Sequence, residues 1–107
     1  MGHLTPAELA AWLADPVRPD PLLLDVREAW EYRTCRIEGA RHMPMQEVPR
    51  RLAELDPATD VVAICHHGVR SLNVAVFLAR QGFERVYNLS GGIDAWARSV
   101  EPAMPVY

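Results

Sequence analysis

The feature that most limits the fold is a short apolar run that leads through a polar loop into a strongly apolar helical pattern. Val61–Ile64 is continuously apolar, which is typical of a strand buried on both faces of a sheet. Residues 71–81 are apolar almost all round, so they predict a deeply packed helix that ends at Gly82. A strand joined by a short loop to a buried helix is the repeating unit of a parallel α/β sheet.

The same alternation of elements runs along the rest of the chain. Residues 5–8 form a capping box with proline at the first helical position, which predicts a short helix that ends near residues 15–16. We expect further helical turns at residues 28–33, at 48–55 and after 91–92. We expect further strands at residues 22–24 and 85–89, a short strand or a loop at 41–44, and an extended tail at 101–107. The predicted fold class is α/β, with a central, mostly parallel sheet flanked by helices on both faces.

Composition limits the size and the setting of this fold. The chain has 107 residues, half of them apolar, so we expect one domain over residues 1–107 that buries a single core. A net charge of −3 without a basic run argues against nucleic-acid or membrane-surface binding. The first residues lack the pattern of a signal peptide, and no apolar run reaches membrane-spanning length. Two cysteines do not make a disulfide scaffold, and a reducing cytoplasm is the simplest compartment.

Cys65 is the expected nucleophile. It lies at the carboxyl end of a predicted parallel strand, where α/β proteins bind ligands, and just before a helix that should begin near Ser71. Unpaired backbone N–H groups at a helix N-terminus and a nearby cation, here Arg70, favour a reactive thiolate. No carboxylate occurs between Asp60 and Glu84. We therefore expect a locally positive site that attracts an anionic substrate.

Four segments, in this order, resemble the signatures of the rhodanese family of sulfurtransferases in its single-domain form. They are residues 23–32, 37–40, 65–71 and 88–96, so the resemblance covers most of the chain. The resemblance implies a rhodanese-like domain with thiosulfate sulfurtransferase activity and no cofactor. It also implies a persulfide mechanism, in which Cys65 takes the outer sulfur of a small anionic donor such as thiosulfate and passes it to cyanide or a thiol.

The resemblance also indicates how the donor would be bound. The loop N–H groups would cradle the anionic sulfur, with Gly68 in a backbone conformation closed to bulkier residues. Where family members commonly carry Gly-His, this chain has Cys35 and Arg36, and Arg36 would add positive charge for the donor. The expected substrate-binding residues are His66, His67, Gly68, Val69, Arg70, Ser71 and Arg36.

Several of these residues also have a plainer interpretation. His66 and His67 either tune the thiolate and bind substrate or are solvated loop histidines. Cys35 is either an ordinary small residue or a resolving cysteine. Cysteine and histidine lack the paired spacing of zinc sites here, so we expect no metal. Asp25 is expected to hold loops through hydrogen bonds from backbone N–H groups.

Other functions stay open on the sequence alone. A small cysteine-dependent phosphatase or arsenate reductase also has a cysteine loop ending in arginine, but four residues separate Cys65 from Arg70, one fewer than in the phosphatase signature. The shorter ring of N–H donors suits a single sulfur better than a tetrahedral oxyanion. Rhodanese-like domains also serve as protein-binding modules, although those tend to lack the cysteine. In a sulfur relay, the partner would be a sulfur-carrier protein, a cysteine desulfurase or thioredoxin.

Overall fold

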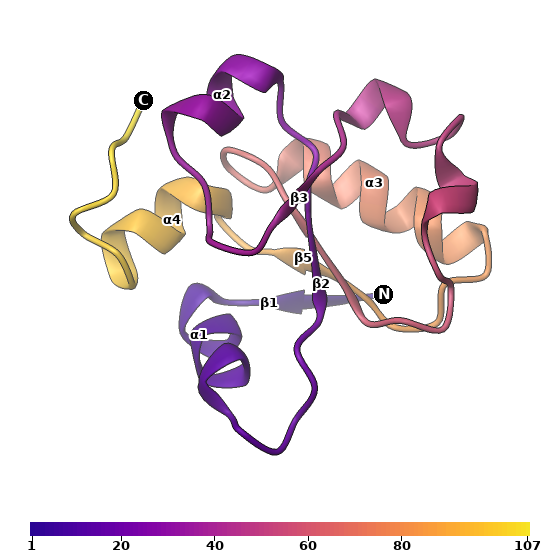
Figure 1. The fold of residues 1–107 in the computed structure, drawn as a ribbon, viewed down its shortest axis with the longest axis horizontal. Helices are drawn as coiled ribbons and strands as arrows, with labels where there is room; N and C mark the ends of the chain where they lie inside the picture. Colours follow the sequence, from indigo (N-terminus) through magenta and orange to yellow (C-terminus); the bar gives the residue numbers. More distant parts are fainter.

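The computed structural model, which describes residues 1–107, contains one five-stranded sheet with helices packed on it (Figure 1). The strand order is β1-β5-β4-β2-β3, and every neighbouring pair is parallel. The strands are β1 (Gly2–Leu4), β2 (Leu22–Asp25), β3 (Arg41–His42), β4 (Val61–Ile64) and β5 (Val86–Leu89). The helices are α1 (Pro6–Ala14), α2 (Ala29–Thr34), α3 (Val69–Arg80) and α4 (Gly92–Ser99), with short 3-10 helices η1 (Met45–Glu47) and η2 (Leu52–Glu54). The predicted α/β class is confirmed.

The expectation of a single core is wrong: each face of the sheet has its own apolar core, because successive residues of a strand point to opposite faces. In β4, Val61 and Ala63 belong to the core on the α3 side, and Val62 and Ile64 belong to the core on the side of α1 and α4. The helices contribute Val74, Ala75 and Leu78 to the first core, and Leu9, Trp12, Ile93 and Trp96 to the second. All four β4 residues are fully buried, which confirms a strand covered on both faces.

Most elements lie where the sequence predicts them. The Thr5 hydroxyl accepts a hydrogen bond from the Glu8 N–H (3.1 Å), and the Glu8 carboxylate accepts one from the Thr5 N–H (2.8 Å), as the capping box requires. The predicted segments at 28–33, 22–24, 41–44 and 85–89 correspond to α2, β2, β3 and β5. The helix α3 begins at Val69, slightly before the expected Ser71, and ends at Arg80.

Other expectations are wrong. Residues 48–55 do not form an α-helix: only Leu52–Glu54 within them is helical, as η2, and the N–H groups of Glu54 and Leu55 donate to carbonyls three residues back, as in a 3-10 helix. The tail at 101–107 is not simply extended, since the Met104 N–H donates to the Glu101 carbonyl (2.9 Å) and the chain turns there. The sequence did not predict β1, which pairs in parallel with β5.

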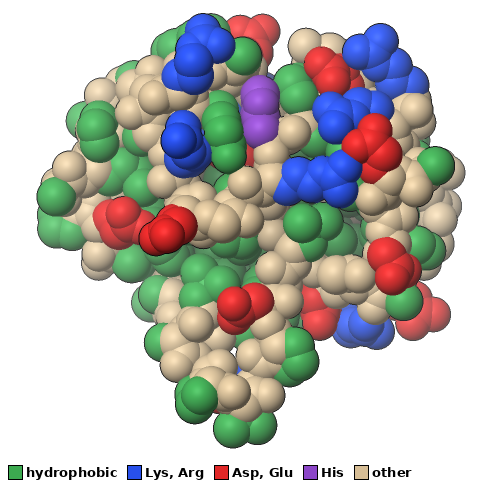
Figure 2. Space-filling view, viewed as in Figure 1, with side chains coloured by type: hydrophobic (Ala, Val, Ile, Leu, Met, Phe, Trp, Pro, Cys, Tyr) green, Lys and Arg blue, Asp and Glu red, His purple; other side chains and the backbone are tan.

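The central strands β4 and β2 bring two polar segments to the same edge of the sheet. Cys65 follows β4, and Arg27 lies just after β2, which pairs with β4 in register. Over the face shown in Figure 2, basic and acidic side chains are interspersed rather than gathered by sign. None of the helices has the length and apolar composition that crossing a bilayer requires.

Candidate active site

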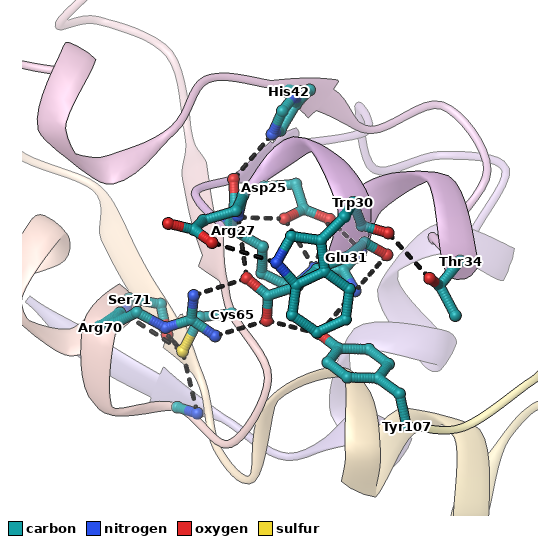
Figure 3. A network of polar contacts seen from close by, with 12 residues as sticks. Asp25, Arg27, Trp30, Glu31, Thr34, His42, Cys65, Arg70, Ser71 and Tyr107 are labelled. Carbon is teal, nitrogen blue, oxygen red and sulfur yellow. Dashed lines mark hydrogen bonds and ion pairs between the residues drawn. The ribbon is translucent and has the colours of Figure 1, made fainter.

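The Cys65 sulfur lies beneath the loop that joins β4 to α3. The residue is only 1% exposed, and its Sγ accepts hydrogen bonds from the N–H groups of Gly68 (3.1 Å) and Ser71 (3.3 Å). The Ser71 hydroxyl lies 3.1 Å from the same sulfur (Figure 3). Because these donors belong to the start of α3, the helix N-terminus is aimed at the sulfur. A negative charge on this sulfur would be stabilised where it forms.

The loop conformation is fixed by one glycine and one buried amide. Gly68 has φ +96°, in the left-handed region that side-chain-bearing residues rarely adopt. Asn88, from β5, donates from Nδ2 to the Gly68 carbonyl (3.1 Å) and accepts from the Ser71 hydroxyl at Oδ1 (2.6 Å). The sequence placed Asn88 in the last rhodanese-like segment but gave it no role, and the structure makes it the support of the loop.

The helix α4 holds the other side of the loop. The N–H groups of Ile93 and Asp94 donate to the carbonyls of Cys65 (2.8 Å) and His66 (3.1 Å). Gly92 has φ +62°, and a Cβ atom added there would lie 2.4 Å from the His66 carbonyl oxygen. Gly92 is therefore required for α4 to approach the loop this closely.

Arg70 is paired with a carboxylate that the sequence did not place near it. Its Nη1 and Nη2 donate to Oε2 (2.7 Å) and Oε1 (2.8 Å) of Glu31, from α2 (Figure 3). The Glu31 side chain is 5% exposed and the Arg70 side chain 34%. Arg70 is therefore not an unpaired cation: the expectation of a locally positive site counted only carboxylates near Cys65 in sequence and did not include Glu31. This pairing also explains how a cation is tolerated at the N-terminus of α3.

The two charges shift each other's titration. Hydrogen bonds from Arg70 lower the pKa of Glu31 from its usual 4.5 to about 2, and the bonds to Glu31 raise the pKa of Arg70. Because the folded state depresses the pKa of Glu31, the pair stabilises the fold above the ordinary carboxyl pKa. That contribution is lost as pH falls from about 4.5 toward about 2.

Glu31→Gln should make the free energy of unfolding depend less on pH in the acidic range. Between about pH 5 and about pH 2, the free energy of unfolding should fall by ~1–2 kcal/mol more in the wild type than in the variant. This is less than the full pKa shift implies, because Arg70 is a third exposed and water screens the pair. Urea unfolding at several pH values measures the two curves. Parallel acid limbs would contradict the assigned pair.

The two loop histidines differ in exposure. The His66 ring stacks on the Tyr107 ring (centroids 4.0 Å apart) and lies tilted by 31° against the His67 ring (3.9 Å). Burial, followed by the charge of His67, lowers the pKa of His66. The His67 side chain is 63% exposed, with Nε2 3.9 Å from Asp94 Oδ2. Neither imidazole hydrogen-bonds the sulfur.

One group of side chains has the atoms of a possible metal site. The ligand atoms of His66, His67 and Asp94 lie within 4.8 Å of one another, but the Asp94 carboxylate also pairs with Arg98 (3.2 Å).

The remaining residues expected at the site have simpler surroundings. The Val69 side chain points outward and is exposed. The Arg36 guanidinium lies over the Tyr32 ring (4.9 Å) and donates to the Tyr32 carbonyl (3.3 Å), so its role in donor binding stays a prediction. Cys35 and Cys65 are both free and buried. The role of Cys35 as a resolving cysteine also stays a prediction.

A buried ion pair supports the site from β2. Asp25 accepts from the Arg27 backbone N–H (3.1 Å), as the sequence predicts, and also binds the Arg27 guanidinium (2.7 Å), with both side chains fully buried. Arg27 in turn donates to the carbonyls of Glu31 (3.2 Å) and Cys35 (2.6 Å). It therefore holds the backbone of α2 at Glu31 and at the C-terminal end of the helix.

Comparison with known proteins gives concordant similarities. A family model described as the rhodanese-like domain matches residues 5–99. The thiosulfate sulfurtransferase GlpE of Actinobacillus pleuropneumoniae is 41% identical over 85 residues, 79% of each chain. A sulfurtransferase of Allochromatium vinosum is 43% identical over 79 residues, 74% of each chain. The crystal structure of a rhodanese-like domain protein from Staphylococcus aureus gives a TM-score of 0.82 at 30% identity, covering 90% of this chain and 91% of that one.

Proposed function

This chain belongs to the rhodanese-like domain family and is a sulfurtransferase, and on that premise we propose that it carries sulfane sulfur as a persulfide on Cys65. The Cys65 thiolate attacks the outer sulfur of thiosulfate, a new S–S bond forms, and the S–S bond of thiosulfate breaks with both electrons leaving on sulfite. The persulfide anion then gives its outer sulfur to cyanide or a thiolate. With cyanide, the S–S bond of the persulfide breaks, thiocyanate forms, and Cys65 is regenerated as a thiolate.

The single observation that carries this proposal is the pair of N–H donors on a buried cysteine sulfur. The Gly68 and Ser71 N–H groups lie 3.1 and 3.3 Å from Sγ at the start of α3. Such fixed donors stabilise a thiolate, and they remain close to the negative charge when it moves to an attached sulfur. No metal or cofactor is needed for either step.

Burial of the sulfur favours this chemistry over phosphate-ester hydrolysis. Cys65 is 1% exposed, so a substrate must reach Sγ with a small protruding group. Thiosulfate presents a single outer sulfur for attack, whereas a phosphatase must bring phosphorus and its oxygens into the loop. With four residues between Cys65 and Arg70, the loop has fewer N–H groups to surround such a group.

The proposed function also includes a cellular compartment and partners for the chain. Residues 1–107 act as one domain, in the cytoplasm, with a small anionic sulfur donor. The persulfide is passed to a thiol, and a sulfur-carrier protein, a cysteine desulfurase or thioredoxin is the protein partner in a relay. The half-exposed Trp30 and the exposed Val69, next to Glu31 and Arg70 of the site, offer apolar surface for such a contact.

Steady-state kinetics with thiosulfate and cyanide varied together test the covalent step. A persulfide intermediate predicts parallel double-reciprocal lines, because sulfite leaves before cyanide reacts. Intersecting lines would contradict the intermediate. A phosphate ester serves as the control substrate, and its turnover at a rate comparable to thiosulfate would favour the phosphatase instead.

A further inference from the structure

The Tyr107 hydroxyl joins two ion pairs that are far apart in sequence. It donates to Glu31 Oε1 (2.9 Å) and accepts from Arg27 Nη1 (3.0 Å) (Figure 3). Arg27 belongs to the buried pair with Asp25, and Glu31 holds Arg70. A neutral hydroxyl can serve a carboxylate and a guanidinium at once, because it both donates and accepts. The Tyr107 hydroxyl therefore links the buried Asp25–Arg27 pair to the ion pair that contains Arg70.

The Tyr107 ring makes a second set of contacts with the site. It stacks on His66, with centroids 4.0 Å apart and planes 16° from parallel, and meets Trp30 edge-on at 5.3 Å. His66 directly follows Cys65, and Trp30 directly precedes Glu31. Burial raises the pKa of Tyr107 to about 12, so the hydroxyl keeps the proton that it donates. One side chain thus contacts both α2 and the catalytic loop.

We infer that Tyr107 is a positioning residue of the sulfurtransferase site, which acts through Glu31 to hold Arg70 beside the Cys65 loop. It does not contact the sulfur, so it is not a catalytic residue. The inference rests on the proposed function in one respect, namely that Arg70 helps to bind the anionic donor. The Glu31 carboxylate accepts four hydrogen bonds: two from Arg70, one from the Glu28 N–H and one from the Tyr107 hydroxyl.

Tyr107→Phe isolates the hydroxyl, because the ring contacts with His66 and Trp30 can persist. Without the hydroxyl, Glu31 Oε1 keeps only Arg70 as a donor, and Arg27 Nη1 loses a short acceptor. The Glu31 carboxylate is then less firmly oriented. Arg70, already a third exposed, would spend more time turned toward solvent.

Steady-state kinetics of Tyr107→Phe give the first test. We expect the KM for thiosulfate to rise about 3- to 10-fold, with kcat changed less than about twofold, because the hydroxyl acts on donor binding. Tyr87→Phe is the matched control: Tyr87 lies on β5, its ring packs edge-on against Trp12, and it has no contact with Glu31. Unchanged kinetics in Tyr107→Phe would overturn the inference.

A double-mutant cycle separates positioning through Glu31 from a general structural role. In the Glu31→Gln background, Tyr107→Phe should change the KM by less than about 1.5-fold, because the carboxylate that it orients is gone. An equal effect in both backgrounds would show that Tyr107 acts by another route. It would overturn the inference even if the single variant were impaired.

Alkylation of Cys65 gives a readout that needs no sulfur transfer. The ratio of the rates with anionic iodoacetate and neutral iodoacetamide, mapped on the Cys65 peptide, reports the positive charge near the sulfur. We expect Tyr107→Phe to lower this ratio about threefold and Tyr87→Phe to leave it unchanged. An unchanged ratio in Tyr107→Phe would overturn the inference. If thiosulfate loads no sulfur onto the wild type, the proposed function fails, while this ratio still decides the role of Tyr107.

Discussion

Cys65→Ser should abolish sulfur transfer while leaving the fold intact. A serine hydroxyl is a far weaker nucleophile than a thiolate and forms no persulfide, so we expect turnover to fall by about a thousandfold or more. The replacement is nearly isosteric, and the Gly68 and Ser71 N–H groups can donate to the new oxygen. Thiocyanate formation measures the loss, and thermal unfolding checks the fold.

Cys35→Ser is the matched control for this experiment. Cys35 is the other free, buried cysteine of the chain, so both variants lose one thiol. If Cys35 is an ordinary small residue, its variant keeps most of the activity. Substantial turnover in Cys65→Ser would contradict Cys65 as the sulfur acceptor. Complete loss of turnover in Cys35→Ser with a normal fold would show instead that Cys35 also takes part in the reaction.

Arg70→Ala should have the second largest effect. It leaves the Glu31 carboxylate, 5% exposed, without its guanidinium partner and places an uncompensated negative charge near an anionic donor. We expect kcat/KM for thiosulfate to fall by about two orders of magnitude, which corresponds to ~3 kcal/mol of transition-state stabilisation. Steady-state kinetics at low ionic strength measure the change, because salt screens the charge effect.

Two further variants show how Arg70 acts. Arg80→Ala removes an exposed cation from the other end of α3 and should leave kcat/KM unchanged. Adding Glu31→Gln to Arg70→Ala removes the orphaned charge and should restore part of the lost kcat/KM. If Arg70→Ala keeps wild-type kcat/KM, the cation does not contribute to donor use.

The central part of the sheet and the position of Cys65 at its edge could be predicted because their signals are local. The continuous apolar run of β4 and the apolar α3 define a strand and a helix within a few residues of Cys65. The capping box at Thr5 likewise fixes the start of α1 through residues three apart. In each case, the interactions that form the element lie inside it.

The partners of Arg70 could not be predicted in this way. Glu31 is 39 residues from Arg70 in sequence, and Tyr107 is 76 residues from Glu31. Their contacts exist only because parallel strands β2 and β4 bring α2 to the loop and because the tail folds back. A charge count along the sequence therefore assigned Arg70 an unpaired charge, and the fold pairs it.

The predictions for the short elements were wrong for a different physical reason. Three residues of β1 carry too little periodicity to distinguish a strand from a loop, and pairing with β5 makes them a strand. Residues 48–55 have helical spacing of apolar positions, but that spacing does not distinguish an α-helix from the short 3-10 helix that forms at Leu52–Glu54. The structure of such short segments depends on contacts with other elements, whereas long periodic segments can be predicted from their own sequence.

The intact mass of the protein, measured after incubation with thiosulfate and again after cyanide, tests directly whether Cys65 carries a persulfide. We predict a gain of one sulfur atom, mapped to the Cys65 peptide, that cyanide removes as thiocyanate. A protein that gains no sulfur while its Cys65 thiol remains free would contradict thiosulfate as the donor. Sulfur that is gained on Cys35 instead would contradict Cys65 as the residue that carries the persulfide.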